Sequence, residues 1–239
     1  MPYSPNTTRA LGAVFFDRDD TMLHTDPARV QAAIRQLASL AGRDEDAVRA
    51  GYNDWQQDIT ARMQREWQTI NTKDKERAFW QARFRDLLAR LGRAAPTSAD
   101  LEQTAGLLFY YKLYTPFADV VPCLRALSRH GLRLGVISDT FPLLRESLAY
   151  HGLARYFSAF TAACRVGYLK PSPEIYRHAL AAMGVAPERA VYVDDKADEA
   201  AGARRLGMRA YVIDRSGRYP HADGIRSLAE LTAEVVGLL

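Results

Sequence analysis

The chain has 239 residues, of which 48% are hydrophobic and 25% charged, a balance typical of a globular protein with enough apolar material for a buried core. Its formal net charge of +4 is spread along the chain, and no dense basic run with interleaved aromatic residues favours nucleic-acid binding. No run approaches the ~20 apolar residues of a membrane span, and the first ten residues, MPYSPNTTRA, lack the apolar stretch of a signal peptide. The two cysteines lack metal-ligand spacing, so we expect a cytoplasmic protein with reduced thiols that binds no membrane.

The first hundred residues contain one predicted strand and a long helical block. Residues 1–10 are polar and turn-prone, and the apolar run at 13–16 predicts a short buried strand. From Pro27 to Tyr114 the apolar residues recur at helical spacing, and we expect roughly four helices and no strand there. Ser98 is the predicted N-cap of the last of these helices.

After Pro116 short apolar runs alternate with helical patterns. This alternation predicts right-handed strand–helix–strand units and a parallel sheet, a Rossmann-like α/β fold. The first strand joins this sheet, so the helical block is an insertion: we expect a core domain from 1–24 and 116–239 and an inserted helical domain from 25–115. The predicted elements are helices at 119–131, 141–152, 173–184, 197–207 and 225–239 and strands at 132–139, 160–164, 190–195 and 209–214.

Polar and charged residues follow the predicted strands of the core. In an open parallel sheet, ligands bind beyond the carboxyl ends of the strands. Carboxylates follow the carboxyl ends of two separate predicted strands, and a hydroxyl and an ammonium group lie in other loops. The residues concerned are Asp17, Asp19, Asp20, Thr21, Ser138, Asp139, Thr140, Lys170, Asp194 and Asp195.

Several carboxylates in one dry crevice need a cation or shared protons to remain there. Oxygen ligands suit a hard divalent cation, and Mg²⁺ commonly uses one or two carboxylates together with waters and phosphate oxygens. The sequence therefore predicts a magnesium site at this edge of the sheet.

Four segments carry a family resemblance: FDRDDT at 16–21, VISDT at 136–140, GYLKPSPEIY at 167–176 and VYVDDKADEAAGARRLGM at 191–208. In order and spacing they resemble the four motifs of the haloacid dehalogenase-like (HAD) hydrolase superfamily. The helical insertion behind the first motif resembles the helical-cap subclass (C1, subfamily I) of that superfamily.

The resemblance implies a phosphatase mechanism. Asp17 would attack phosphorus to give an aspartyl-phosphate, and Asp19 would protonate the leaving oxygen and then activate water. The implied phosphate-binding residues are Thr21, Ser138, Asp139 and Lys170.

The resemblance also implies the Mg²⁺ ligands: a carboxylate of Asp17, the backbone carbonyl of Asp19 and the carboxylate of Asp195. The fourth motif departs from the commonest pattern after Asp195, which leaves Asp194, Asp198 and Glu199 as alternatives for support of the metal. Two further departures are Asp20, where glycine is frequent, and Asp139, where asparagine is usual.

We therefore expect a Mg²⁺-dependent phosphoric monoester hydrolase acting on a small phosphorylated metabolite. An Asp at position 19 favours phosphate esters over carbon–halogen bonds, because a halide leaves without a proton. A sugar phosphomutase would use the same intermediate, and a non-enzymatic binding protein could keep the fold. The sequence predicts neither the substrate nor the oligomeric state.

Overall fold

The computed structural model describes residues 10–217 and 224–239, so residues 1–9 of the predicted N-terminal lead lie outside it. Contacts between Cα atoms divide the chain into two compact units. The first, called the sheet unit here, comprises Met1–Met22, Phe117–Asp139 and Arg155–Leu239. The second, the helical unit, comprises Leu23–Pro116 and Thr140–Ala154.

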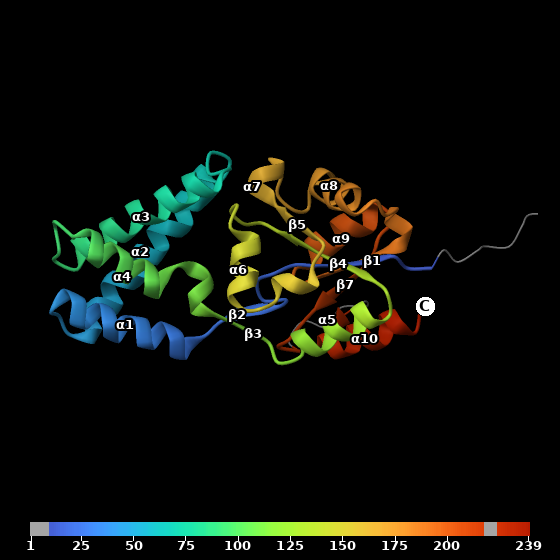
Figure 1. The fold of residues 1–239 in the computed structure, drawn as a ribbon, viewed down its shortest axis with the longest axis horizontal. Helices are drawn as coiled ribbons and strands as arrows, with labels where there is room; N and C mark the ends of the chain where they lie inside the picture. Colours follow the sequence, from blue (N-terminus) through green and yellow to red (C-terminus); the bar gives the residue numbers. More distant parts are fainter. Residues whose placement is uncertain (1–9, 218–223) are drawn as a thin grey trace, which may run out of the picture. The chain divides into compact units, whose positions relative to one another are not determined.

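The sheet unit contains a six-stranded sheet in the order β5-β4-β1-β6-β7-β8, and every neighbouring pair is parallel. This confirms the predicted α/β fold with β1 in the interior of the sheet (Figure 1). The strands are β1 (Ala13–Phe16), β4 (Arg133–Ser138), β5 (Ala159–Ala162), β6 (Ala190–Asp194), β7 (Arg209–Ile213) and β8 (Gly224–Ile225).

Helices cover both faces of this sheet. Helices α8 and α9 lie on one face, whereas α5 and α10 lie on the other (Figure 1). Strands β1 and β6 are buried at every residue, as expected when both faces of a parallel sheet are covered. The helical elements of the unit are α5 (Val120–Arg129), α7 (Ala163–Val166), α8 (Pro173–Met183), α9 (Ala197–Arg205), α10 (Leu228–Val236) and the 3₁₀ turns Ala154–Tyr156 and Pro187–Arg189.

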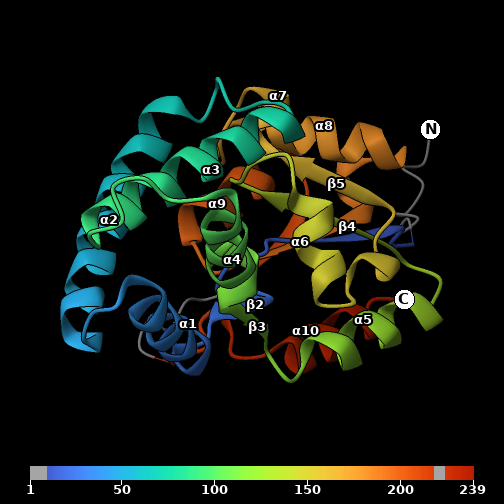
Figure 2. The same ribbon diagram turned by 60° about the vertical axis from the view of Figure 1, so that its left-hand side comes forward.

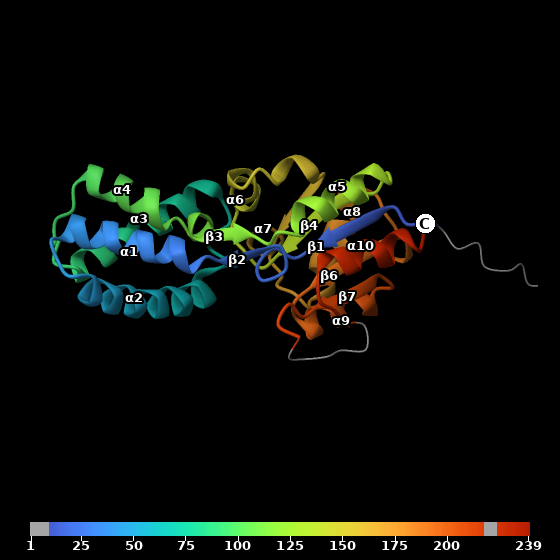
Figure 3. The same cartoon turned by 90° about the horizontal axis from the view of Figure 1, so that it is seen from below.

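The helical unit is built from four longer helices, as the sequence predicts, and from a short two-stranded ribbon (Figures 2 and 3). Trp55 and Trp80 each stack on Phe84 in its interior, so these aromatic side chains pack the helices together. The elements are α1 (Pro27–Ala41), α2 (Glu45–Glu66), α3 (Lys73–Arg90), α4 (Ser98–Leu108), the 3₁₀ helix Tyr110–Leu113, α6 (Leu144–Tyr150), β2 (Leu23–Thr25) and β3 (Tyr114–Pro116).

Three local predictions are wrong. The N-cap of α4 is Thr97 and not Ser98: the Thr97 hydroxyl accepts from the N–H of Asp100, whose carboxylate accepts from the N–H of Thr97. The strand predicted at 160–164 ends at Ala162, and α7 begins at the next residue, Ala163. The helix predicted from residue 225 begins at Leu228, because Gly224–Ile225 pairs with β7 instead.

Both cysteines are thiols buried in the core, as expected of reduced cysteines. Among the described residues, no helix combines the length and the apolar character that a membrane span requires.

Candidate active site

Asp17 follows β1 directly at the carboxyl edge of the sheet. Its backbone N–H donates to the carbonyl of Val193 at 2.9 Å, which continues the β1–β6 ladder by one residue and sets Asp17 beside Asp194 at the end of β6. On the other side of β1, strand β4 ends at Ser138. Strands β4 and β5 lie on one side of β1, and strands β6 to β8 lie on the other. The order of strands therefore reverses at β1, and ligands bind at such a topological switch point in open parallel sheets.

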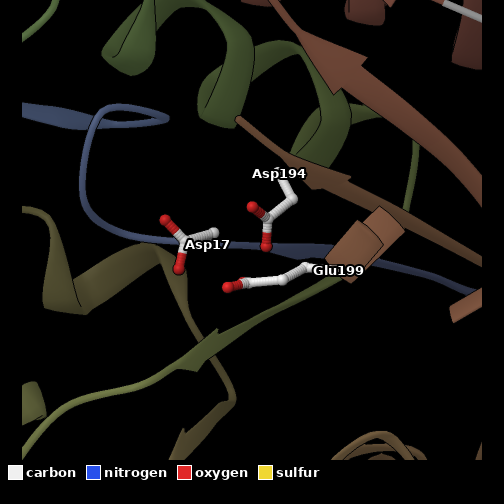
Figure 4. Close-up of side chains that lie close together, drawn as sticks. All are labelled: Asp17, Asp194 and Glu199. Carbon is white, nitrogen blue, oxygen red and sulfur yellow. The ribbon is translucent and has the colours of Figure 1, made fainter. Parts of the chain in front are cut away.

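Lys170 lies among three buried carboxylates. Its Nζ is 2.7 Å from a carboxylate oxygen of Asp17, 2.8 Å from one of Asp194 and 2.5 Å from one of Glu199. Figure 4 shows these three carboxylates converging from the end of β1, the end of β6 and the first turn of α9. Their oxygens lie within 4.8 Å of one another, a spacing that could also hold a metal ion. Because Lys170 lies in the middle of this group, its ammonium supplies positive charge to all three carboxylates.

Burial and charge act against each other here. Burial lowers the pKa of Lys170, but the facing carboxylates outweigh it and raise that pKa well above its usual value. The pKa of Asp194 is lowered, since Lys170 and further hydrogen bonds more than offset its burial. Burial raises the pKa of Asp17, with Lys170 acting in the opposite direction. One ammonium shared among several carboxylates therefore leaves the site short of positive charge.

The phosphate-binding candidates surround this cluster. Ser138 is buried at the end of β4. The carboxylate of Asp139 accepts the backbone N–H of Lys170 at 3.0 Å, and burial raises its pKa, with the nearby Lys170 opposing. Thr21 is fully buried, and its hydroxyl has no hydrogen-bond partner among the residues that the structure describes. A buried hydroxyl of this kind is suited to donate to a bound anion.

A tight turn holds Asp19 and Asp20. The N–H of Met22 donates to the carbonyl of Arg18 at 3.0 Å, closing a turn around them. Asp20 has φ 54°, a left-handed conformation that glycine adopts without strain and aspartate tolerates better than most residues. The half-buried Asp19 is paired with Arg18.

The predicted metal ligand Asp195 and the alternatives Asp194 and Asp198 lie around the end of β6. Asp195 is half-buried, and burial with the nearby Asp194 raises its pKa to about 7. Lys196 opposes this shift, whereas Asp20 adds to it. Asp198 is exposed, and its carboxylate accepts the N–H of Glu199.

Two residues, Tyr192 and Glu199, contact Lys170 in ways that the sequence did not predict. Tyr192 lies 3.1 Å from the Lys170 ammonium and donates its hydroxyl to Asp194. Alternation along a strand puts residues 192 and 194 on the same side, which was the available signal. Glu199, an alternative for support of the metal, lies in the first turn of α9 and in the group of carboxylates that could hold an ion, and it also pairs with Lys170, which the sequence did not predict.

The comparisons with known proteins identify the family. Residues 11–207 match the model of the haloacid dehalogenase-like hydrolases, so the chain belongs to this family of enzymes, as the four motifs predict. Phosphoserine phosphatase of Thermus thermophilus is 31% identical over 84% of this chain and 88% of its own length. Glyceraldehyde 3-phosphate phosphatase of Methanopyrus kandleri is 31% identical over 87% and 85%. Among solved structures, 2-haloacid dehalogenase from Pseudomonas syringae is 26% identical and covers 95% of this chain and 98% of its own, with a TM-score of 0.63.

Proposed function

We propose that the protein is a Mg²⁺-dependent phosphatase that hydrolyses a small phosphorylated metabolite through an aspartyl-phosphate intermediate. The observation that carries this proposal is the contact of 2.7 Å between the carboxylate of Asp17 and the ammonium of Lys170 at the carboxyl edge of β1. A carboxylate nucleophile with an adjacent fixed cation is what phosphoryl transfer to an enzyme requires.

In the proposed reaction an oxygen of Asp17 bonds to phosphorus, and the ester oxygen leaves with a proton from Asp19. Asp19 then takes a proton from water, which attacks the aspartyl-phosphate and releases inorganic phosphate. Lys170, Ser138 and Thr21 donate hydrogen bonds to the phosphoryl oxygens and stabilise the charge that develops there.

The donor set fits Mg²⁺. Hard oxygen atoms surround the site, and burial together with the neighbouring Asp194 raises the pKa of Asp195, as expected where carboxylates gather. Asp17, the Asp19 carbonyl and Asp195 would hold the ion, with Asp194 and Asp198 as further candidates. When bound, Mg²⁺ supplies positive charge to the phosphate oxygens.

Dehalogenation is the alternative that the family leaves open, because both kinds of enzyme occur among the related proteins. Asp19 favours the phosphatase, since an alkoxide needs a proton to leave and a halide does not. The names of the two phosphatase relatives support phosphate monoesters of small metabolites as the substrate class.

The test is a panel of sugar, amino-acid and triose phosphates assayed for free phosphate with Mg²⁺. We expect release that depends on Mg²⁺, and Asp17→Asn to abolish it while the variant remains folded. Asp74→Asn, at an exposed position of α3, is the matched control and should keep wild-type activity. No release from any ester would contradict the proposal, and conversion to an isomeric phosphate would identify a mutase.

A further inference from the structure

Arg18 stands between the proposed nucleophile and the proposed acid/base and has no role in the mechanism above. It is a buried arginine, with its side chain 5% exposed. Its Nε donates to one carboxylate oxygen of Asp19 at 2.9 Å and its Nη2 to the other at 2.7 Å. This is a two-pronged ion pair between residues adjacent in the chain.

Such a pair requires a particular backbone. Successive side chains in a strand point to opposite faces, so residues i and i+1 cannot pair while the chain is extended. Here β1 has ended at Phe16, and the turn closed by the Arg18 carbonyl and the Met22 N–H brings the two side chains together. The same turn is fixed farther along, where the guanidinium of Arg215 donates to the carbonyl of Thr21.

The ion pair with Arg18 holds the Asp19 side chain in place but leaves some of its hydrogen-bonding sites open. Each carboxyl oxygen of Asp19 has two lone-pair sites, and the guanidinium takes one on each oxygen, so one oxygen can still carry the proton that goes to the leaving group. The Asp19 side chain is 39% exposed, so the remaining sites are accessible. Because the guanidinium is planar and buried, it fixes the plane of the carboxylate as well as its position.

We infer that Arg18 is a positioning residue that orients the Asp19 carboxylate for proton transfer to the leaving oxygen. The inference rests on the proposed function and deepens it. A misplacement of about 1 Å in a catalytic group can cost on the order of a hundredfold in rate, so an orienting group at this point has a measurable effect.

The test compares two esters that differ in their need for an acid. p-Nitrophenolate leaves with little help, whereas the alkoxide of glycerol 2-phosphate must be protonated. The quantity measured is kcat/KM with Mg²⁺, which reports the steps up to phosphoryl transfer to the enzyme. We expect Arg18→Met to lower kcat/KM about tenfold to a hundredfold for glycerol 2-phosphate and less than about threefold for p-nitrophenyl phosphate.

Three further variants make the test specific. Arg18→Lys keeps a charge but not the fork, so its selective loss should fall between those of wild type and Arg18→Met. Arg18→Met combined with Asp19→Asn should be no slower than Asp19→Asn alone, because Arg18 acts through Asp19. The matched control is Arg93→Met, which breaks another arginine–carboxylate pair, between Nη2 and both oxygens of Asp100 in the helical unit, and should leave the ratio between the two esters unchanged.

Two results would show that Arg18 acts on the phosphate or on the fold: an equal loss of kcat/KM on both esters, or additive losses in the double variant. Either result would overturn the inference about Arg18 but not the proposed function. A wild-type enzyme inactive on both esters would instead contradict the proposed function on which it rests. The carboxyl ¹³C resonance of Asp19 gives a readout independent of turnover: we expect it to move in Arg18→Met, and an unchanged resonance would also overturn the inference.

Discussion

The ammonium group of Lys170 is shared by carboxylates of Asp17, Asp194 and Glu199, all of them buried. Removing one partner of a buried charge network leaves uncompensated charges, which typically costs about 3–5 kcal/mol. We therefore expect Lys170→Met to lower the free energy of unfolding by roughly this amount at neutral pH without metal, measured by chemical denaturation.

Lys196 is the matched control for that variant. Its side chain is 59% exposed and pairs with Glu199 at 2.9 Å. Exposed ion pairs contribute at most about 1 kcal/mol, so Lys196→Met should be nearly as stable as wild type. Equal losses of unfolding free energy in the two variants would mean that burial of the lysine does not determine its contribution to stability.

The buried thiol of Cys123 should make the stability of the protein depend on pH. Burial raises the pKa of its thiol from 9.0 to about 11, so between these values the folded chain keeps a proton that the unfolded chain has lost. The folded state then binds more protons, and the free energy of unfolding must fall as the pH rises from about 9 to 11, by at most about 2–3 kcal/mol. Cys123→Ala should remove this part of the slope. Denaturation curves at both ends of the range measure it, and identical slopes would contradict the assignment.

At the scale of elements, α9 packs closely against the loop that carries Lys170. A Cβ atom at Gly202 would lie 2.8 Å from the Cβ of Pro171 and 3.0 Å from the Tyr176 hydroxyl. We expect Gly202→Ala to destabilise the protein by about 1–3 kcal/mol and to lower activity, because Pro171 follows Lys170. Thermal denaturation and kcat measure the two effects.

Gly106 provides the control within a helix. It is exposed in α4, and an added Cβ would meet nothing within 4 Å. Gly106→Ala should therefore gain about 0.5–1 kcal/mol from helix propensity. If Gly202→Ala were stabilising as well, the close approach of α9 would not be the constraint that the structure indicates.

Helix α6 begins without a side-chain cap of its own. Glu76 on α3, which is fully buried, supplies the acceptor: its Oε2 takes the N–H of Leu143 at 2.6 Å. Glu76→Ala should cost about 1–3 kcal/mol by leaving that N–H unbonded, whereas Glu76→Gln keeps an acceptor and should cost less. Hydrogen exchange at the Leu143 amide would increase in the alanine variant, and unchanged protection would contradict this role.

The elements show what sequence patterns can and cannot predict. The alternating strands and helices of the sheet unit were predicted because their periodicities and glycine stops are strong signals. Strands β2, β3 and β8 have two or three residues each, too few for a period to be visible. At α4 two adjacent hydroxyls compete, and Thr97 is the one with a carboxylate three residues on, the spacing of a capping box.

For the site, the motifs led to Asp17 and Lys170, which are separated by 153 positions and are in contact. The partners of Lys170 were less predictable. Four carboxylates lie close together in the sequence: Asp194, Asp195, Asp198 and Glu199. The fourth motif alone does not indicate which of them face the lysine. That choice depends on where β6 ends and how α9 leaves it.

At the scale of the whole molecule, the residues of the site come from three separate segments of the chain that fold into the sheet unit. The sheet brings the ends of β1, β4 and β6 together, and the loop before α8 adds Lys170. The activity proposed for the protein therefore depends on long-range order in the sheet, which a single substitution at any of these strand ends can disturb.

The central claim is that Asp17 is the group that accepts phosphate, and trapping the phosphorylated enzyme tests it most directly. The enzyme is quenched in acid during turnover of p-nitrophenyl phosphate with Mg²⁺, and its peptides are analysed by mass spectrometry. We predict one added phosphoryl group on the peptide that contains Asp17, and none in Asp17→Asn. Phosphate release without any adduct, or an adduct on a different residue, would contradict the account.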